Sequence, residues 1–449
     1  MKIKKYRCSC PHERPFLYKM SKNSNSTNSL GDLLSDLQRN QLGAKKASPK
    51  IPNPIYIKTF EELEKAALKW NKCNQIAIDT EFDDNNNYYG RHLCLVQIYD
   101  KDKIYLIDTV KLEGNINPLL AVLENPNVEK IFHSCSSDLI VVGDVCNCAI
   151  KNIQDTALMY RFLLKSHNDI GLQSLVEEKL NIELEKQEQV SDWAKRPLSK
   201  SQLIYAATDV IYLFELFEIL KKELQELERW NWYKEEREKL EEIGEESTNN
   251  KSDSENKKVI AALKTAIKYK LPEEQNVRFA LYWNLRDEVA KRVNRPHYRV
   301  ISNNLLADLV QRPPKKLEEW QNLRGSSHHF KKRADEFFTL SKVDLSQRKN
   351  IFFQELDRRA EEKEEYFHEK RQHQRTLHQR EIIFTNLREA LTDYNGLNMQ
   401  SLILSNKNKN DVLWNGIESV TNSWKMEVLE NIAKQNEWNI DVLKGQLKN

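Results

Sequence analysis

The chain has 449 residues, enough for two to four domains of about 100–200 residues each, and 39% hydrophobic with 31% charged residues is an ordinary globular composition. No apolar run approaches the roughly 20 residues that span a bilayer, and no apolar segment follows the basic N-terminus, which excludes a membrane protein and argues against secretion. Seven scattered cysteines indicate a reducing cytoplasm rather than a disulfide framework, and the net charge of +3 excludes no class of partner.

The first half of the chain predicts a leader followed by a mixed α/β domain. Residues 1–50 are polar, with a low-complexity Ser/Asn stretch, and we expect a disordered leader there. From residue 51 to 232, short apolar runs alternate with amphipathic stretches, as in α/β domains. Four runs predict strands, at residues 75–82, 92–100, 103–108 and 129–134.

The second half predicts helical modules joined by polar segments. Residues 233–258 are acidic and then rich in Ser and Asn, which predicts a linker. Residues 259–345 predict a small helical bundle, and its part from Arg278 to Arg333 is basic, with 13 Lys or Arg against 5 Asp or Glu. Residues 346–381 predict a mixed-charge, solvated helical connector, and residues 382–449 a further helical domain.

Two acids end a predicted buried strand. Asp79 and Glu81 follow the apolar run at 76–78, and because side chains two apart share a strand face, their carboxylates project together. Such a pair is costly without a positive partner, and its hard oxygen ligands suit Mg²⁺ or Mn²⁺. Two solvated acids in an exposed turn remain the alternative.

Two further signals place acids on predicted helices. Asp138 lies in the first turn of a helix, where it could bind a metal ion or simply complement the helix dipole. Tyr205 and Asp209 are four residues apart and so share one helical face. Taken alone, that pair could be a satisfied buried hydrogen bond.

In order and separation, these signals resemble ribonuclease D, a family in the DEDD superfamily of 3′-5′ exonucleases, in the branch whose third motif carries tyrosine. The resemblance covers residues 55–225 and rests on DTEF at 79–82, HSCSSDL at 133–139 and the run from Ser191 to Val210, which contains YAATD. It implies a ribonuclease H-like α/β fold, with a mixed sheet and flanking helices, followed by one or two all-α HRDC-like domains.

The resemblance also implies two-metal phosphodiester hydrolysis with two Mg²⁺ or Mn²⁺ ions. Asp79 would bridge the ions, Glu81 and Asp209 would complete one site, and Asp138 would support the other. Tyr205 would position the attacking water. Phe82 would lie near the terminal nucleotide of the substrate.

Two features depart from this pattern. Residues 83–87 (DDNNN) are acidic and polar, where basic character is expected near a nucleic-acid backbone. Asp155 also falls on a family-like Asp-Thr, but it opens a helix, so we interpret it as an N-cap and not as a metal ligand.

Residues 281–325 resemble an HRDC domain, which implies contact with nucleic acid; a structural spacer is the alternative. Residues 385–406 and the pair Trp424-Lys425 resemble a degenerate second copy. The basic excess supplies salt-sensitive attraction to phosphates, and an exposed aromatic ring can stack on bases. The candidate substrate-binding residues of the first copy are Arg286, Arg295, Tyr298, Lys315 and Lys316.

Together these features predict a 3′-5′ exoribonuclease that releases 5′-monophosphates. The expected partner is RNA with a free 3′ end, such as a precursor tRNA, acted on by a cytoplasmic monomer. Two alternatives stay open: a 3′-5′ exonuclease that acts on DNA, and an RNA-binding scaffold without activity. The choice between RNA and DNA depends on contacts to the 2′-hydroxyl, which the motifs do not specify.

Overall fold

The structure is a computed structural model that describes residues 51–163, 170–184, 188, 190–249, 254–345 and 351–447. The leader predicted for residues 1–50 lies outside the described residues. No helix in the described ranges is long and apolar enough to cross a membrane.

The first domain is built on a six-stranded mixed sheet with the strand order β1-β4-β3-β2-β5-β6. Pairs β2/β3 and β3/β4 are antiparallel, and the other three neighbouring pairs are parallel. The predicted mixed sheet is confirmed. Strands β1 and β6, of three residues each, were not predicted, because so short a run carries no clear alternation. The strands are β1 Ile55–Ile57, β2 Gln75–Asp84, β3 Arg91–Tyr99, β4 Ile104–Ile107, β5 Glu129–Phe132 and β6 Ile153–Asp155.

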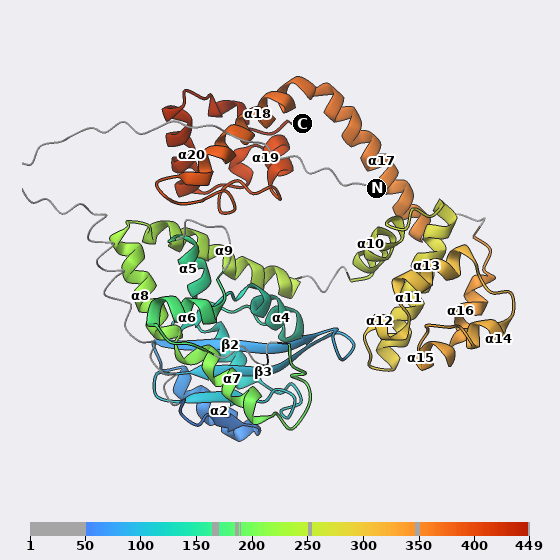
Figure 1. Cartoon of the computed structure of the whole chain (residues 1–449), viewed down its shortest axis with the longest axis horizontal. Coiled ribbons are helices and arrows are strands. Elements are labelled where there is room, and N and C mark those ends of the chain that lie inside the picture. The colour runs from blue at the N-terminus through green and yellow to red at the C-terminus, as the bar shows by residue number, and fades with distance from the viewer. Residues whose placement is uncertain are drawn as a thin grey trace, which may run out of the picture. The chain divides into compact units, whose positions relative to one another are not determined.

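Strand β2 lies inside the sheet, paired with β3 on one side and β5 on the other. Its first half is apolar because it enters the core: Ile76, Ala77 and Ile78 are fully buried. Helices cover the sheet, with α4, α5 and α9 above β2 and β3 in Figure 1 and α2 below. Helix α7 packs across β2, β3 and β4. The helices are α2 Phe60–Trp70, α3 Asn117–Glu124, α4 Ser136–Cys146, α5 Thr156–Arg161, α6 Leu172–Leu180, α7 Lys200–Ile211, α8 Leu213–Glu226 and α9 Trp230–Asn249.

The linker predicted for residues 233–258 is wrong over most of its length, because α9 continues to Asn249 and packs on α4. A Cβ on Gly143 of α4 would lie 2.7 Å from the Cβ of Ser247, so glycine permits the close approach of the two helices. Tyr233 of α9 is fully buried and donates a hydrogen bond to Gln154 (2.7 Å). The sequence pattern did not predict helix α9 because its composition is acidic and few of its positions are buried.

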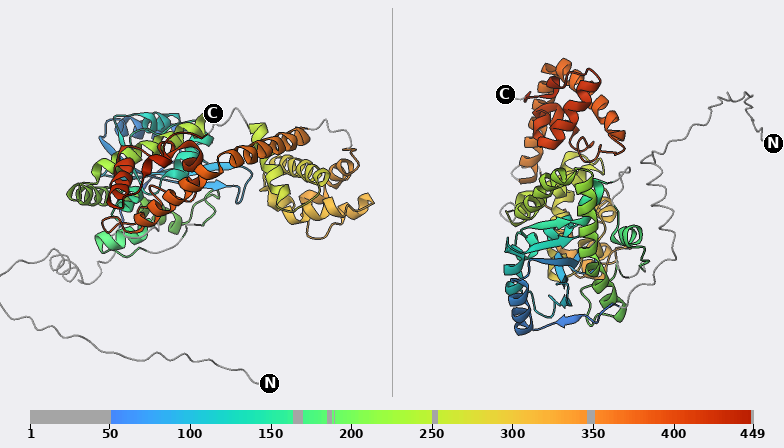
Figure 2. Two further views of the ribbon diagram at one scale, coloured as in Figure 1. Left: turned by 90° about the horizontal axis from the view of Figure 1, so that it is seen from above. Right: turned by 90° about the vertical axis from the view of Figure 1, so that its left-hand side faces the viewer.

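Residues 254–345 are helical, so the helices begin five residues before the bundle predicted for residues 259–345, and Figure 2 shows the yellow-to-orange helices as one compact group. Its core is aromatic, with Phe279, Tyr282, Trp320, Phe330 and Phe337 fully buried. The helices are α10 Ser254–Ile267, α11 Glu273–Arg292, α12 His297–Val300, α13 Asn303–Gln311, α14 Leu317–Gln321, α15 His328–Lys331 and α16 Ala334–Ser341.

The C-terminal residues 351–447 are helical. Helix α17 exposes most of its residues, as expected for the solvated connector. Helix α18, however, runs through the boundary predicted at 382, and Arg380 is already buried in the module that follows. Trp424 of α20 stacks on Trp232 of α9 with ring centroids 5.3 Å apart. The helices are α17 Ile351–Gln372, α18 Gln374–Ala390, α19 Lys409–Asn415 and α20 Ser423–Gln435, with short 3₁₀ turns at Leu391–Asp393, Ile417–Ser419 and Ile440–Leu443.

Candidate active site

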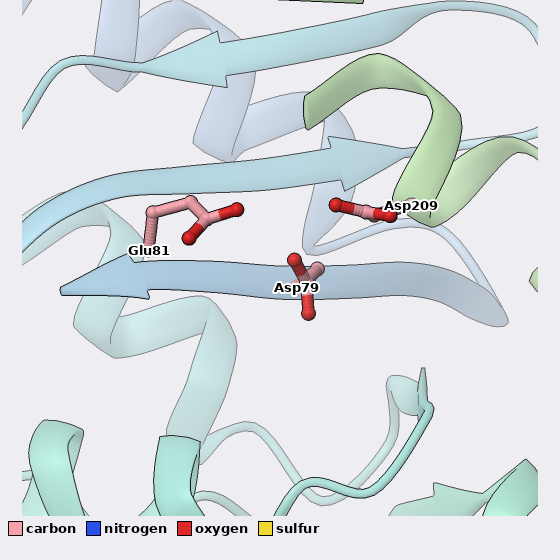
Figure 3. Close-up of side chains that lie close together, drawn as sticks. All are labelled: Asp79, Glu81 and Asp209. Atoms are coloured by element: carbon pink, nitrogen blue, oxygen red, sulfur yellow. The ribbon is translucent and has the colours of Figure 1, made fainter. Parts of the chain in front are cut away.

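Three acids converge where strand β2 meets helix α7. Asp79 and Glu81 project from one face of β2, and Asp209 reaches toward them from α7 (Figure 3). One carboxylate oxygen from each residue lies within 4.8 Å of the other two. The fold therefore brings together Asp79 and Asp209, which are 130 positions apart in the chain.

The electrostatics of this cluster favour a bound cation. Burial, followed by the charges of neighbouring acids, raises the pKa values of Asp79 and Glu81 well above their usual range, and burial raises the pKa of Asp209 to about 8. Within the described part of the chain, no lysine or arginine forms an ion pair with any of the three. Closely spaced carboxylates of this kind are suitable ligands for a hard divalent ion such as Mg²⁺ or Mn²⁺.

Asp138 lies beside the cluster but has a different partner. It occupies the first turn of α4, as predicted, and its buried carboxylate accepts a hydrogen bond from the hydroxyl of Thr80. Its charge contributes to the raised pKa values of Asp79 and Glu81. Because side chains alternate along a strand, Thr80 faces away from the side that carries Asp79 and Glu81. No signal in the sequence predicted its hydrogen bond to Asp138, 58 residues further on.

Asp155 fixes the start of the helix that carries Asp138. It is the N-cap of α5, as predicted, and accepts hydrogen bonds from the backbone N–H groups of Ala157 and Leu158. The same carboxylate also accepts from the N–H of Cys135, the N-cap of α4, at 2.7 Å. It therefore joins two helix starts and does not belong to the acid cluster.

Tyr205 lies one helical turn before Asp209 on α7, as the spacing predicts. Burial, with smaller contributions from Asp209, Glu81 and Asp79, raises the pKa of its phenol above the usual range. The phenol is thus protonated at neutral pH and can act as a hydrogen-bonding group, not as a base. Its ring lies against Trp193, with centroids 6.0 Å apart.

Phe82 and the hairpin after it continue the acid-bearing strand. The register of β2 and β3 shifts between Glu81 and Phe82, and the Phe82 side chain is half-buried against the core. In the following turn, the Asp83 carboxylate accepts hydrogen bonds from the N–H groups of Asn86 (3.1 Å) and Asn87 (3.0 Å). The unexpected DDNNN segment is therefore a turn that uses an acid to satisfy its own backbone.

Four of the five candidate substrate-binding residues of the helical bundle are exposed, and Arg286 is buried. Arg286 is 1% exposed and donates from Nη1 to the Ile301 carbonyl (3.2 Å) and to Asn303 Oδ1 (2.6 Å), which is a structural arrangement. Arg295 and Tyr298 are exposed and donate to backbone carbonyls of the β2–β3 turn. Lys315 and Lys316 are exposed at the start of α14.

Comparison with known proteins identifies two family matches in the chain. Residues 54–225 match the 3′-5′ exonuclease family and residues 275–340 match the HRDC domain. Over 262 residues the chain is 31% identical to ribonuclease D of Sphingobium indicum, a match that spans 58% of this chain and 64%, less than two thirds, of that relative. It is 32% identical over 267 residues to ribonuclease D of Desulfotalea psychrophila, which covers 59% of this chain and 69% of the relative.

A solved structure supports the fold. The crystal structure of Escherichia coli RNase D, described as an exoribonuclease involved in structured RNA processing, superposes with a TM-score of 0.59 at 20% identity. The superposition covers 86% of this chain and 99% of that one. The likeness therefore includes helical parts of the chain beyond the sheet domain.

Proposed function

Because this chain belongs to the ribonuclease D family, we propose that it is a 3′-5′ exoribonuclease that removes nucleotides singly from RNA 3′ ends and releases 5′-monophosphates. The observation that carries the proposal is the convergence of Asp79, Glu81 and Asp209 within 4.8 Å, with Tyr205 one turn away on α7. Three half-buried acids that repel one another favour a metal-binding active site over a scaffold without activity.

In this proposal the four acids would hold two divalent ions between them. Asp79, central on β2, would contact both ions, with Glu81 and Asp209 completing one site. Asp138, held by the hydroxyl of Thr80, would support the second. When bound, such ions activate water and neutralise the charge that develops on the phosphodiester group in the transition state.

Tyr205 would orient the attacking water by a hydrogen bond. Its raised pKa keeps the hydroxyl protonated, so it contributes geometry and not proton abstraction. Phe82, on the strand that carries the acids, would contact the terminal base or sugar. Loss of the hydroxyl should therefore lower the turnover rate and leave RNA affinity unchanged.

The proposed substrate is structured RNA with a short unpaired 3′ tail, such as a precursor tRNA. The excess of basic residues between Arg278 and Arg333 supports phosphate contact beyond the cleaved nucleotide. We further propose that the enzyme acts as a monomer, because Asp79, Glu81 and Asp209 can form one ligand set without residues of a second copy. We also propose a cytoplasmic location, because the seven cysteines are scattered along the chain and do not indicate a disulfide framework.

Matched RNA and DNA hairpins test the proposal. Each carries the same 5′ label and 3′ tail and is incubated with Mn²⁺, Mg²⁺ or EDTA, with products resolved at single-nucleotide resolution. We expect stepwise, metal-dependent shortening of RNA from the 3′ end. Equal shortening of DNA would instead indicate a general 3′-5′ exonuclease, and no shortening of either would favour the scaffold.

A further inference from the structure

We propose that Arg196 is the positioning residue for Tyr205. It lies in the Trp193 loop, residues 190–198, which precedes α7, and it acts by holding the Trp193 indole against the Tyr205 phenol. This inference rests on the proposed function only for its catalytic consequence. The packing it describes belongs to the fold.

Arg196 uses all five of its N–H donors within the exonuclease domain. Nε and Nη2 donate to the two carboxylate oxygens of Asp108, both at 2.7 Å, in a bidentate ion pair. Nη2 also donates to the carbonyl of Cys94 on β3 (2.7 Å), and Nη1 to the carbonyls of Trp193 (2.5 Å) and Lys195 (2.9 Å). One guanidinium thus joins the Trp193 loop to strand β3 and to the residue that follows β4.

Asp108, directly after β4, is a fixed anchor for this arginine. Its side chain is fully buried, that of Arg196 is 10% exposed, and Asp108 also accepts hydrogen bonds from Tyr56 and from the backbone N–H of Lys111. Arginine beside it holds the pKa of this carboxyl below its usual range despite burial. The pair therefore remains charged, and a planar guanidinium is required because an ammonium cannot donate in a bidentate fork.

The Trp193 loop connects Arg196 to the active site through the side chain of Trp193. The indole is 3% exposed and lies 6.0 Å from the Tyr205 ring at an angle of 40°. On the other side of the loop, Gln202 of α7 donates to the hydroxyl of Ser191 (2.8 Å), which fixes the loop to the same helix. The phenol is held between its own helix and the indole of Trp193, whose backbone carbonyl accepts a hydrogen bond from Arg196.

The contrast with the active-site acids explains why we assign positioning and not catalysis. Every N–H of Arg196 already has a protein partner, so none is available to a phosphate. The residue contacts Trp193 and not Tyr205. Its effect on the reaction must therefore pass through the indole, and it should disappear when the Tyr205 hydroxyl is removed.

A double-mutant cycle tests this dependence. We expect Arg196→Lys to lower kcat on a tailed RNA hairpin about tenfold while KM changes less than twofold. In a Tyr205→Phe background, the same change should lower kcat less than twofold further. Full tenfold losses in both backgrounds would overturn the proposal. Trp193→Phe, which leaves the ion pair intact, should show the same non-additivity and serves if Arg196→Lys folds poorly.

Arg380→Lys is the matched control. Arg380 is also largely buried, at 3% exposed, and donates to the carbonyls of Leu413, Val442, Lys444 and Gly445 in the C-terminal module. We expect it to lower the unfolding temperature as Arg196→Lys does but to leave kcat unchanged. An equal loss of kcat in both variants would mean that Arg196 supports only stability.

A second readout does not depend on turnover. With 3-fluorotyrosine incorporated at position 205, the ¹⁹F resonance should be single in the parent chain, shifted or split in Arg196→Lys and unchanged in Arg380→Lys. An unchanged resonance in Arg196→Lys would refute the positioning role even in an active enzyme. If the parent chain leaves RNA intact while the resonance responds, the proposed function fails and the positioning role stands.

Discussion

The acid cluster on β2 and α7 differs from the buried Arg286 of the helical bundle in whether its charges have protein partners. Asp79, Glu81 and Asp209 lie within 4.8 Å of one another, without an ion pair to lysine or arginine among the described residues. The three acids are half-buried, whereas Arg286 is 1% exposed and its Nη1 has two oxygen partners. Clustered carboxylates without a protein cation indicate a ligand site, whereas a buried charge with hydrogen-bond partners indicates a structural role.

The largest effect should follow from removing the central unpartnered acid. Asp79→Asn keeps the shape of the side chain but removes the carboxylate that would contact both ions, so we expect kcat to fall about 10³-fold. RNA affinity should stay within threefold, measured with a chain-length series of tailed hairpins. Asp102→Asn, on an acid whose side chain is 68% exposed, is the control and should be fully active. Appreciable turnover by Asp79→Asn would contradict the metal-site assignment.

The raised pKa of Asp209 predicts an unusual dependence of stability on pH. Burial raises the pKa of Asp209 to about 8 from an ordinary value of 3.8, so between these values the native state binds more protons than the unfolded state. The free energy of unfolding in EDTA should therefore fall as pH rises from about 4 to about 8. Saturating Mn²⁺ should remove the fall, because cation binding neutralises the repulsion.

Urea unfolding at pH 5 and pH 8, with EDTA or Mn²⁺, measures this effect. Asp209→Asn is the informative variant, since it lacks the titrating group and should show a weaker dependence in EDTA. A rise in stability with pH in EDTA would mean that these acids are ionised and compensated in the native chain.

The parts of the site that could be predicted from sequence are those whose chemistry dictates both residue type and local spacing. Asp79 and Glu81 share a strand face, and Tyr205 and Asp209 share a helix face, so local geometry suffices for each pair. The contact between Thr80 and Asp138 joins residues that are far apart in sequence and has no such period. The fold was predictable where strands were long, and β1 and β6 were too short to be recognised.

Charge counts predicted less well because they contain no information on burial. The acidic stretch after residue 233 is a helix, since Tyr233 and Leu240 on its inner face are enough to pack it. Arg286 contributed to the basic excess of its module but lies inside the bundle. Tertiary contacts distinguish these cases, for example the hydrogen bond from Arg286 to the carbonyl of Ile301. Such contacts involve turns whose conformation the composition does not specify.

Replacing Arg286, whose charge has hydrogen-bond partners, should lower the stability of the helical bundle and leave the rate of RNA hydrolysis unchanged. Arg286→Met leaves the Ile301 carbonyl and the Asn303 side chain without their donor, so we expect the bundle to lose about 2 kcal/mol of stability. Hydrolysis of a short single-stranded RNA below the new unfolding temperature should be unchanged. Thermal unfolding of this variant beside Arg299→Met, which alters an exposed arginine of the same bundle, gives the comparison. Weaker RNA binding at undiminished stability would restore Arg286 as a substrate contact.

The smallest effect concerns charges that are exposed and so can meet RNA. Lys315→Ala with Lys316→Ala should weaken binding of a tailed hairpin about threefold at 0.1 M salt and reduce the salt slope by at most about 2, because each lysine that contacts a phosphate releases about one counterion. Lys268→Ala with Lys270→Ala, two exposed lysines outside the Arg278–Arg333 stretch, makes the same change in net charge. If both pairs weaken binding equally, attraction depends on total charge, and the basic stretch is no more than a spacer. A larger effect of the first pair would locate the phosphate contact at the start of α14.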